Sequence, residues 1–439
     1  MAQRIAAMAP AILSAAARLS ATFLLFAALL FALGMAWNTG GWPVSLAEAM
    51  IFALTGITAL RALCIRRADF PWTTSILATA CIWIAAQLCA GQSVYRFGTF
   101  QSLLIFLSIA GAFWSTVQLF ESHAALRAVR WLLIAIGSAT AAFSILYLLT
   151  SNGRVYWVVD TLDSWRPMGP FLNANHNAVF MELLLPLALW EALHGARQRY
   201  AGGAAAVLMY SSVIFSASRA GMILASLEIA ALLLDALVRA RFSRRIILVG
   251  CGLLASVAGG AFFSDWQTVL RRFQTNDMFQ QRRELLQSTA LMIREHPVTG
   301  SGLGTWAIVY PRFAVFEPGL AVYHAHNDWA EWTAEGGVPF VVLLGAVVLR
   351  SILLIRRFPW GAGVAAAAAH GFVDFPFHVY ADLLCFFLIA ALLEAAARNE
   401  QLARQPPATV IRKVTPRVHV LAPAPQHPAV RARKEWSSE

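Results

Sequence analysis

Long apolar runs recur along this chain of 439 residues and constrain its fold more than any other feature. Crossing a hydrocarbon layer of about 30 Å takes roughly 20 apolar residues in a helix that rises about 1.5 Å per residue. Only helices fit runs of this length. The sequence therefore predicts an all-α, polytopic integral membrane protein.

The composition supports this class, because 59% of the residues are hydrophobic, only 13% are charged and the mean hydropathy is +0.62. Two of the runs, the seventh and the eleventh, are short and rich in Ala and Gly, which suits re-entrant or closely packed segments. We expect about twelve membrane-spanning helices, at residues 19–37, 44–62, 71–90, 101–119, 131–149, 176–194, 203–216, 219–238, 246–263, 338–355, 359–373 and 380–397.

The net charge of +11 indicates membrane topology rather than nucleic-acid binding, because the basic residues lie in every second connection between the apolar runs. By the positive-inside rule these connections and both termini are cytoplasmic. The long connections 150–175 and 264–337 then face the outside. The basic residues are Arg61, Arg66 and Arg67, Arg127 and Arg130, Arg197 and Arg199, Arg239, Arg241, Arg244 and Arg245, and Arg350, Arg356 and Arg357.

We expect a membrane domain over residues 1–398, with a helical external loop at 264–337 that carries the catalytic region. The basic, proline-rich segment 399–439 is predicted to be a cytoplasmic tail that is disordered near anionic lipid. The Ala-rich start, residues 1–17, leads into a full span and is interpreted as retained rather than cleaved. The five cysteines lie in or beside apolar runs without metal-ligand spacing, so no disulfide framework is predicted.

The external loop contains a predicted amphipathic helix at 280–296, which Pro297 and three nearby glycines end. Arg282 and Arg283 lie at its start, where a positive charge opposes the helix dipole at a cost of about 0.3 to 1 kcal/mol. A bound anion would compensate that cost. The alternative is that each arginine is a solvated surface charge.

A second candidate is Arg219 in "SRAG", within a very short external link between two spans. A charge at that depth is expensive unless it is paired or lines a wet cavity. The alternative is an interfacial arginine that reaches the lipid headgroups. Within the spans, Glu182, Glu228 and Asp235 would likewise need a cation or a proton.

A third candidate is the polar group Asn173, Asn175, His176 and Asn177 in "GPFLNANHNA", immediately before a span. Such a group can bind sugar hydroxyls, but Asn clusters also form turns and helix caps.

The stretch "YHAHNDWAEW" contains the fourth candidate, His326. Asp328 and Glu331 resemble a capping box, so a helix is predicted to begin near Asn327 or Asp328, with Trp329 and Trp332 at the membrane interface. The positive end of that helix disfavours imidazolium, which leaves His326 neutral and able to act as a general base.

Two other interpretations of the histidine pair remain. His324, His326 and Asp328 could bind a metal, although no further ligand with recognisable spacing is present, or the pair could be purely structural. We predict no metal in the site.

At these residues the chain resembles the O-antigen ligase and Wzy-type polymerase superfamily of bacterial envelope glycosyltransferases. The likeness covers roughly residues 169–349 and rests on the order of "GPFLNANHNA", "SRAG", an arginine before "EHPVTGSGLGTW", and "HAHNDWAEWTAEGGVP". It implies a GT-C-like polytopic enzyme of the bacterial inner membrane, with its active site facing the periplasm.

The resemblance also implies that a glycan passes from undecaprenyl pyrophosphate to an acceptor hydroxyl without metal, nucleotide or other cofactor. His326 would be the base, and Arg219 and Arg282 would hold the pyrophosphate. Arg283, His324 and Asn327 join the polar group at 173–177 as expected substrate-binding residues. Members often have an aromatic residue four positions after the loop arginine, where this chain has Leu286, so the choice between Arg282 and Arg283 stays open.

The expected reaction is an inverting transfer, most simply ligation of O-antigen to lipid A core. Polymerisation of a growing polysaccharide and O-glycosylation of a protein are the alternatives within the superfamily. A secondary transporter lined by Glu182, Arg219 and Glu228 is the alternative from another class, and it predicts inverted repeats that the sequence does not show. The other partners expected are membrane lipids.

Overall fold

The computed structural model describes residues 2–38, 40–66, 68–160, 167–196, 198–240, 244–263, 277–316 and 321–404. These residues form helices and connections, with two isolated β-bridges and no strand among them. The all-α prediction is confirmed. Residues 405–439 of the predicted tail lie outside the described part, whereas its first residues continue the last helix to Arg404.

In chain order, the helices of the described residues are α1 (Ala2–Gly34), α2 (Gly41–Cys64), α3 (Trp72–Cys89), α4 (Arg96–Leu119), α5 (His123–Thr150), α6 (Ala174–His194), α7 (Arg199–Ser216), α8 (Arg219–Ala240), α9 (Arg244–Phe263), α11 (Asp277–Glu295), α12 (Trp306–Val309), η1 (Tyr310–Arg312), α13 (Asp328–Ile355), η2 (Pro359–Gly361), α14 (Gly363–His370), η3 (Pro376–His378) and α15 (Tyr380–Arg404).

Eight of the described helices are long and apolar enough to cross a membrane, namely α1 to α5, α8, α13 and α15. The apolar runs predict about twelve spans, and the difference lies in α6, α7, α9 and α14. The run at 359–373 folds as a short 3-10 turn followed by α14, whose 8 residues are too few to cross a bilayer. The protein is therefore a multi-pass membrane protein, and among its described helices α14 is too short for a full span.

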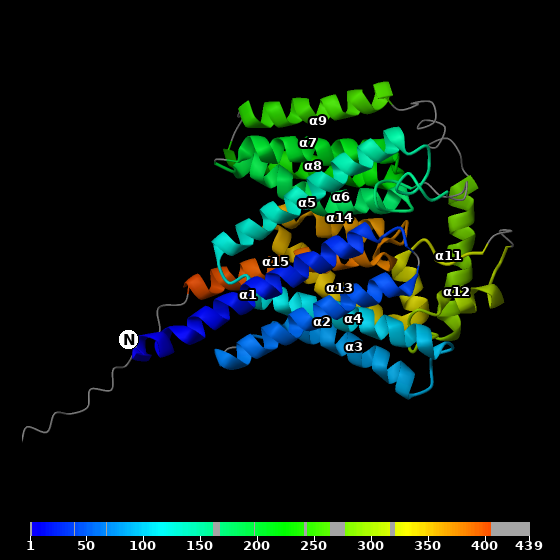
Figure 1. Ribbon diagram of the computed structural model, residues 1–439. Coiled ribbons are helices and arrows are strands. Elements are labelled where there is room, and N and C mark those ends of the chain that lie inside the picture. The colour runs from blue at the N-terminus through cyan, green and yellow to red at the C-terminus, as the bar shows by residue number, and fades with distance from the viewer. Residues whose placement is uncertain are drawn as a thin grey trace, which may run out of the picture.

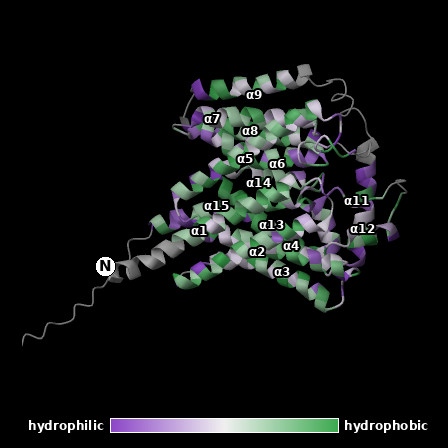
Figure 2. Ribbon diagram, in the orientation of Figure 1, coloured by the Kyte–Doolittle hydropathy of each residue, from purple (hydrophilic) through white to green (hydrophobic). Residues whose placement is uncertain are grey.

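The long helices lie side by side, and α11 runs across their ends on one side of the bundle (Figure 1). Helix α15 is the central element, because its apolar window is fully buried and it packs on α4, α6 and α13. Hydrophobic residues fill the middle of the bundle and hydrophilic residues gather toward its two ends (Figure 2). This distribution is typical of a protein whose middle faces lipid and whose ends face water.

One end of the bundle holds arginine–carboxylate pairs. Arg130 pairs with Glu191 at 2.9 Å, and Arg350 pairs with Glu394 at 3.0 Å. Both arginines belong to the connections predicted to be basic, which fits the positive-inside pattern. Arg67, Arg197 and Arg241 of that prediction lie outside the described residues.

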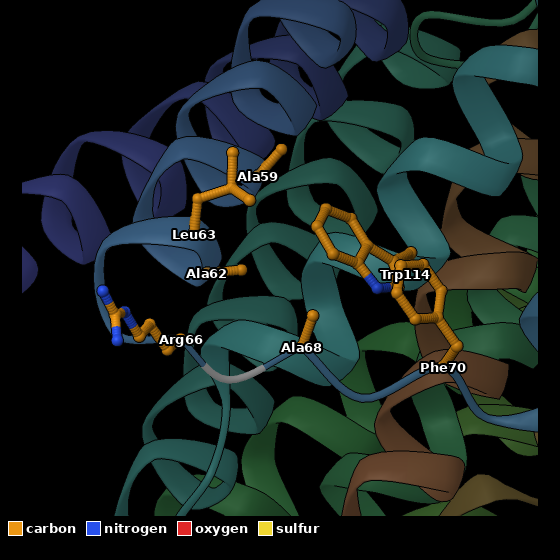
Figure 3. A pocket seen from close by; sticks show the side chains of 7 residues that line it. All are labelled: Ala59, Ala62, Leu63, Arg66, Ala68, Phe70 and Trp114. Atoms are coloured by element: carbon orange, nitrogen blue, oxygen red, sulfur yellow. The ribbon is translucent and has the colours of Figure 1, made fainter.

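An apolar pocket of about 470 Å³ lies at the same end (Figure 3). Its rim includes Phe70, whose ring stacks on Trp114 at 5.5 Å between centroids. The start of α4 lies against the glycine-rich turn at 300–304, at the opposite end of that helix from Trp114. The pocket is therefore remote from the catalytic candidates, and its lining residues are Ala59, Ala62, Leu63, Arg66, Ala68, Phe70 and Trp114.

Candidate active site

The site begins where α13 begins, at the position that the sequence predicts. Asn327 caps the helix, and its side chain accepts a hydrogen bond from the Ala330 backbone N–H at 2.9 Å. The two carboxylates of the supposed capping box point elsewhere. Asp328 binds His378, and Glu331 binds His324. The helix start is thus as predicted, but the capping-box interpretation is wrong.

The two tryptophans of this helix also lie differently from the prediction. Trp332 is buried and stacks on Phe377 at 5.6 Å, while Trp329 donates from Nε1 to the Ala368 carbonyl at 2.9 Å. Both rings therefore pack α13 against α14 and η3 rather than anchoring it among lipid headgroups. This packing brings the connection between α14 and α15 beside His326.

His326 lies in a left-handed backbone conformation, with φ of 52°, immediately before the cap. A residue other than glycine adopts this conformation at some cost, which the surrounding contacts must offset. The Asp328 N–H donates to the Gly371 carbonyl at 2.8 Å, and the Asn327 amide donates to the Phe372 carbonyl at 2.9 Å. These bonds fix the turn and direct the His326 ring toward Asp374.

Asp374 is the residue that organises the site. Its Oδ1 lies 2.9 Å from His326 Nδ1 and accepts from the Phe375 N–H at 3.1 Å, while its other oxygen accepts from the Asn175 amide and lies 3.7 Å from Arg282. Burial alone would raise the pKa of Asp374, but the hydrogen bond from His326 and the charges of His326 and Arg282 hold it well below its usual range.

An ionised Asp374 fixes the tautomer of His326. A carboxylate only accepts hydrogen bonds, so the Nδ1 that faces it carries the proton. In the neutral form of the ring, the remaining nitrogen, Nε2, carries the lone pair, and the His326 side chain is 31% exposed. The expectation of a base at this position rested on the helix dipole alone, and the structure adds a carboxylate that orients the ring.

The loop arginines differ in their surroundings. Arg282 is half-buried and points toward Asp374, whereas Arg283 is exposed. Leu285 and Met292 hold α11 in this orientation, because they pack in a small separate core with Trp306 and Tyr310. The geometry therefore distinguishes the two arginines that the sequence left as alternatives.

Arg219 opens α8, directly after a two-residue link from α7. Its guanidinium interacts electrostatically with that of Arg282, although the two residues are far apart in the chain.

The other residues of the "SRAG" motif pack the start of α8 against α6. Ser218 accepts from the Gly221 N–H at 3.2 Å, and a Cβ at Gly221 would lie 2.6 Å from Ala178 on α6.

The four polar residues at the start of α6 make different contacts. Asn173 caps the helix by accepting from the Asn175 N–H at 2.9 Å, and Asn175 contacts Asp374. Asn177 is fully buried and joins three helices, since it accepts from Ser144 at 2.8 Å and donates to Ser212 at 3.1 Å. His176 is buried with its ring against Phe375 at 4.9 Å. Asn175 is the member that reaches the His326 site directly.

A second polar cluster adjoins the first. His324 Nδ1 lies 2.9 Å from Glu331 Oε1, and His378 Nε2 lies 3.2 Å from the same oxygen. His378 Nδ1 lies 2.7 Å from Asp328 Oδ1. Burial lowers the pKa of His378, but the surrounding carboxylates, Glu331 and Asp328 first, outweigh burial and raise it to about 10. His324, His326 and Asp328, the metal set considered as an alternative, bind three different partners, namely Glu331, Asp374 and His378.

The residues of the motifs that carry the sequence resemblance thus lie together at one end of the bundle. Residues 204–345 match a family model described as O-antigen ligase. This segment of the chain is similar to the O-antigen ligase family. No curated protein matches the chain.

The matched segment runs from α7 into α13 and contains Arg219, Arg282 and His326. The residues that complete the site lie outside the matched segment. Asn175 precedes it, and Asp374 and His378 follow it. The family match therefore covers the candidate catalytic residues but not the carboxylate that orients the base.

Sequence reasoning missed Asp374, His370 and His378, which recur at every fourth position in "HGFVDFPFH". A signal was present, because the connection after residue 373 is on the same predicted side as the loop 264–337. The predicted need of Glu182 for a partner is met by His370 Nδ1 at 2.9 Å, in a fully buried pair. Asp235 pairs with Arg239 at 2.8 Å.

Proposed function

We propose that this protein transfers a glycan from undecaprenyl pyrophosphate to an acceptor hydroxyl. The O-antigen ligase match supports a transferase of the ligase or polymerase type. The observation that carries the proposal is the His326–Asp374–Arg282 group, in which one buried carboxylate holds both an imidazole and a guanidinium.

His326 is proposed as the base that activates the acceptor. Its Nε2 takes the hydroxyl proton as the acceptor oxygen attacks the anomeric carbon, and the Asp374 carboxylate stabilises the imidazolium that forms. His326 touches the reacting hydroxyl in this scheme, whereas Asp374 acts through the ring and is a positioning residue.

Arg219 and Arg282 are proposed to bind the pyrophosphate leaving group. Guanidinium groups form paired, charge-assisted hydrogen bonds with phosphate oxygens. Two such groups close enough to repel each other are stabilised by an anion between them, and they stabilise the charge that develops as the glycosidic bond breaks. Asn173, Asn175, His176, Arg283, His324 and Asn327 remain the predicted substrate contacts, with Asn175 supported by its position beside Asp374.

Attack from the face opposite the pyrophosphate inverts the anomeric centre, and no step requires a metal. We favour ligation to lipid A core at the periplasmic face of the bacterial inner membrane. A polymerase or a protein O-glycosyltransferase would use the same donor chemistry with another acceptor.

The test is transfer from purified undecaprenyl-pyrophosphate glycan to lipid A core by the full chain in nanodiscs. His326→Ala, Arg219→Ala and Arg282→Ala should each lower the rate by about 10²- to 10⁴-fold, which is the range of general-base and transition-state charge contributions. The matched control is Arg294→Ala, which removes an exposed guanidinium from the last turn of the same helix, α11, and should keep near-native activity. Full activity of His326→Ala, or release of chemically unchanged glycan by the native protein, would exclude the mechanism.

A further inference from the structure

The cluster beside the catalytic candidates has the composition of a metal site. Three ligand atoms converge from three segments, namely His324 Nδ1, His378 Nε2 and Glu331 Oε1, and all lie within 4.8 Å of one another. His324 precedes α13, Glu331 lies in its first turn, and His378 ends η3. The sequence shows no ligand spacing here because the third ligand comes from a distant segment.

The two distances from Glu331 to the histidines are close to those between ligands of a bound ion. Two ligand atoms that each lie about 2.0 to 2.2 Å from one ion are separated by roughly 3.0 to 3.5 Å. The Glu331 oxygen lies 2.9 Å from His324 Nδ1 and 3.2 Å from His378 Nε2. The two imidazole nitrogens lie within 4.8 Å of each other, so the rings would turn inward by on the order of 1 Å to seat an ion among the three atoms.

The surrounding groups orient these ligands as they do in known metal centres. His378 turns Nε2 inward because its Nδ1 faces Asp328 at 2.7 Å, and such a carboxylate fixes the ring and strengthens the ligand. The second Glu331 oxygen accepts from the Ala325 N–H at 2.7 Å, which leaves the first oxygen for the ion. Two carboxylates in a buried cluster also favour a cation.

We propose that His324, Glu331 and His378 bind a divalent transition metal of the zinc class. Two imidazoles and one carboxylate suit Zn²⁺ or Co²⁺ better than Mg²⁺ or Ca²⁺, which prefer oxygen ligands. The side chains of His324 and His378 are partly exposed to solvent. The ion would tie the 321–327 connection, α13 and η3 together, and it takes no part in the proposed transfer step.

The experiment uses the full chain, purified without a polyhistidine tag, stripped with a chelator and titrated with Co²⁺ and then Zn²⁺. The native protein should bind one ion per chain, and X-ray absorption should show two imidazole ligands and one carboxylate. His324→Ala and His378→Ala should lose this binding. Asp328→Asn should weaken it about 10- to 100-fold, as the loss of an outer carboxylate does.

The matched control is His296→Ala, which removes an exposed histidine just beyond α11 and should bind as the native protein does. X-ray absorption on the native protein does not depend on how well any variant folds. Absence of imidazole ligands, or unchanged binding by both His324→Ala and His378→Ala, would overturn the proposal. Metal binding and glycan transfer are measured separately, so failure of one leaves the other standing.

Discussion

At the scale of the residue, the partner of His326 decides what its ring can do. The Asp374 carboxylate accepts a hydrogen bond from His326 Nδ1, so Nε2 is not used in this contact. The same carboxylate faces Arg282. One buried side chain thus couples the proposed base to the proposed anion site. His326 adopts an unfavourable left-handed backbone conformation, and this conformation positions its ring beside Asp374.

Replacement of Asp374 by Asn tests this coupling. The amide keeps the shape but loses the charge and can donate to Nδ1, which allows the wrong tautomer. The transfer rate should fall on the order of 10²- to 10⁴-fold, with a smaller change in the acceptor KM, as measured by steady-state transfer assays. The control is Asp160→Asn, because Asp160 is exposed and pairs only with Arg154 among the described residues. An unchanged rate for Asp374→Asn would exclude the positioning function.

Acid should remove the stabilisation that Asp374 provides. Its pKa in the folded protein is held well below its value in the unfolded chain, about 3.9, so its contribution is complete above that value. The contribution is lost as the pH falls through 3.9 toward the folded pKa. In thermal unfolding, the native protein should exceed Asp374→Asn by a constant margin at neutral pH and by a shrinking one below about pH 4. A margin that stays constant down to pH 3 would contradict this assignment.

At the scale of the element, the kink in α13 sets the position of the site. Gly337 has φ of 72° within the helix, and a Cβ there would lie 1.9 Å from the Val298 carbonyl. The glycine-rich turn docks on the kink, since Ser301 donates to the Ala334 carbonyl at 3.0 Å and Gly302 donates to that of Glu335 at 2.9 Å. The first turns of α13, which carry Glu331, are thereby held at a fixed angle to its membrane segment.

The kink can be tested with two glycines of one helix. Gly337→Ala should destabilise the protein by more than about 2 kcal/mol, because it combines a left-handed backbone with a clash against another backbone, and it should also lower transfer. Gly345→Ala adds the same methyl group where no atom lies within 4 Å and should be neutral or stabilising by up to about 1 kcal/mol. Thermal unfolding in detergent measures both. Equal behaviour of the two variants would mean that the kink is not required.

At the scale of the whole molecule, the two ends of the bundle differ in chemistry. The Arg130–Glu191 and Arg350–Glu394 pairs lie at one end, and the His326–Asp374 site and α11 lie at the other. The positive-inside rule predicts that the first end is cytoplasmic and that the second faces the outside. A donor lipid in the outer leaflet would then reach the site from the membrane.

Cysteine labelling tests this orientation. In a background where the five native cysteines are replaced, Tyr323→Cys lies beside the site and Arg66→Cys lies at the arginine-rich end, both at exposed positions. A membrane-impermeant maleimide should label Tyr323→Cys in intact spheroplasts and Arg66→Cys only after permeabilisation. The reverse pattern would invert the topology.

The sequence by itself determined the class of the protein, the start of α13 and the extent of α11, and it singled out Arg219, Arg282 and His326 as candidates. These features follow from local signals, namely apolar length, capping side chains, proline and the cost of placing a charge near lipid. Only the tertiary structure decided that α14 is too short to cross, that Arg282 rather than Arg283 faces the site, and that Asp374 and His378 complete it. Those facts depend on which distant segments pack together, and no local pattern of residues contains that information.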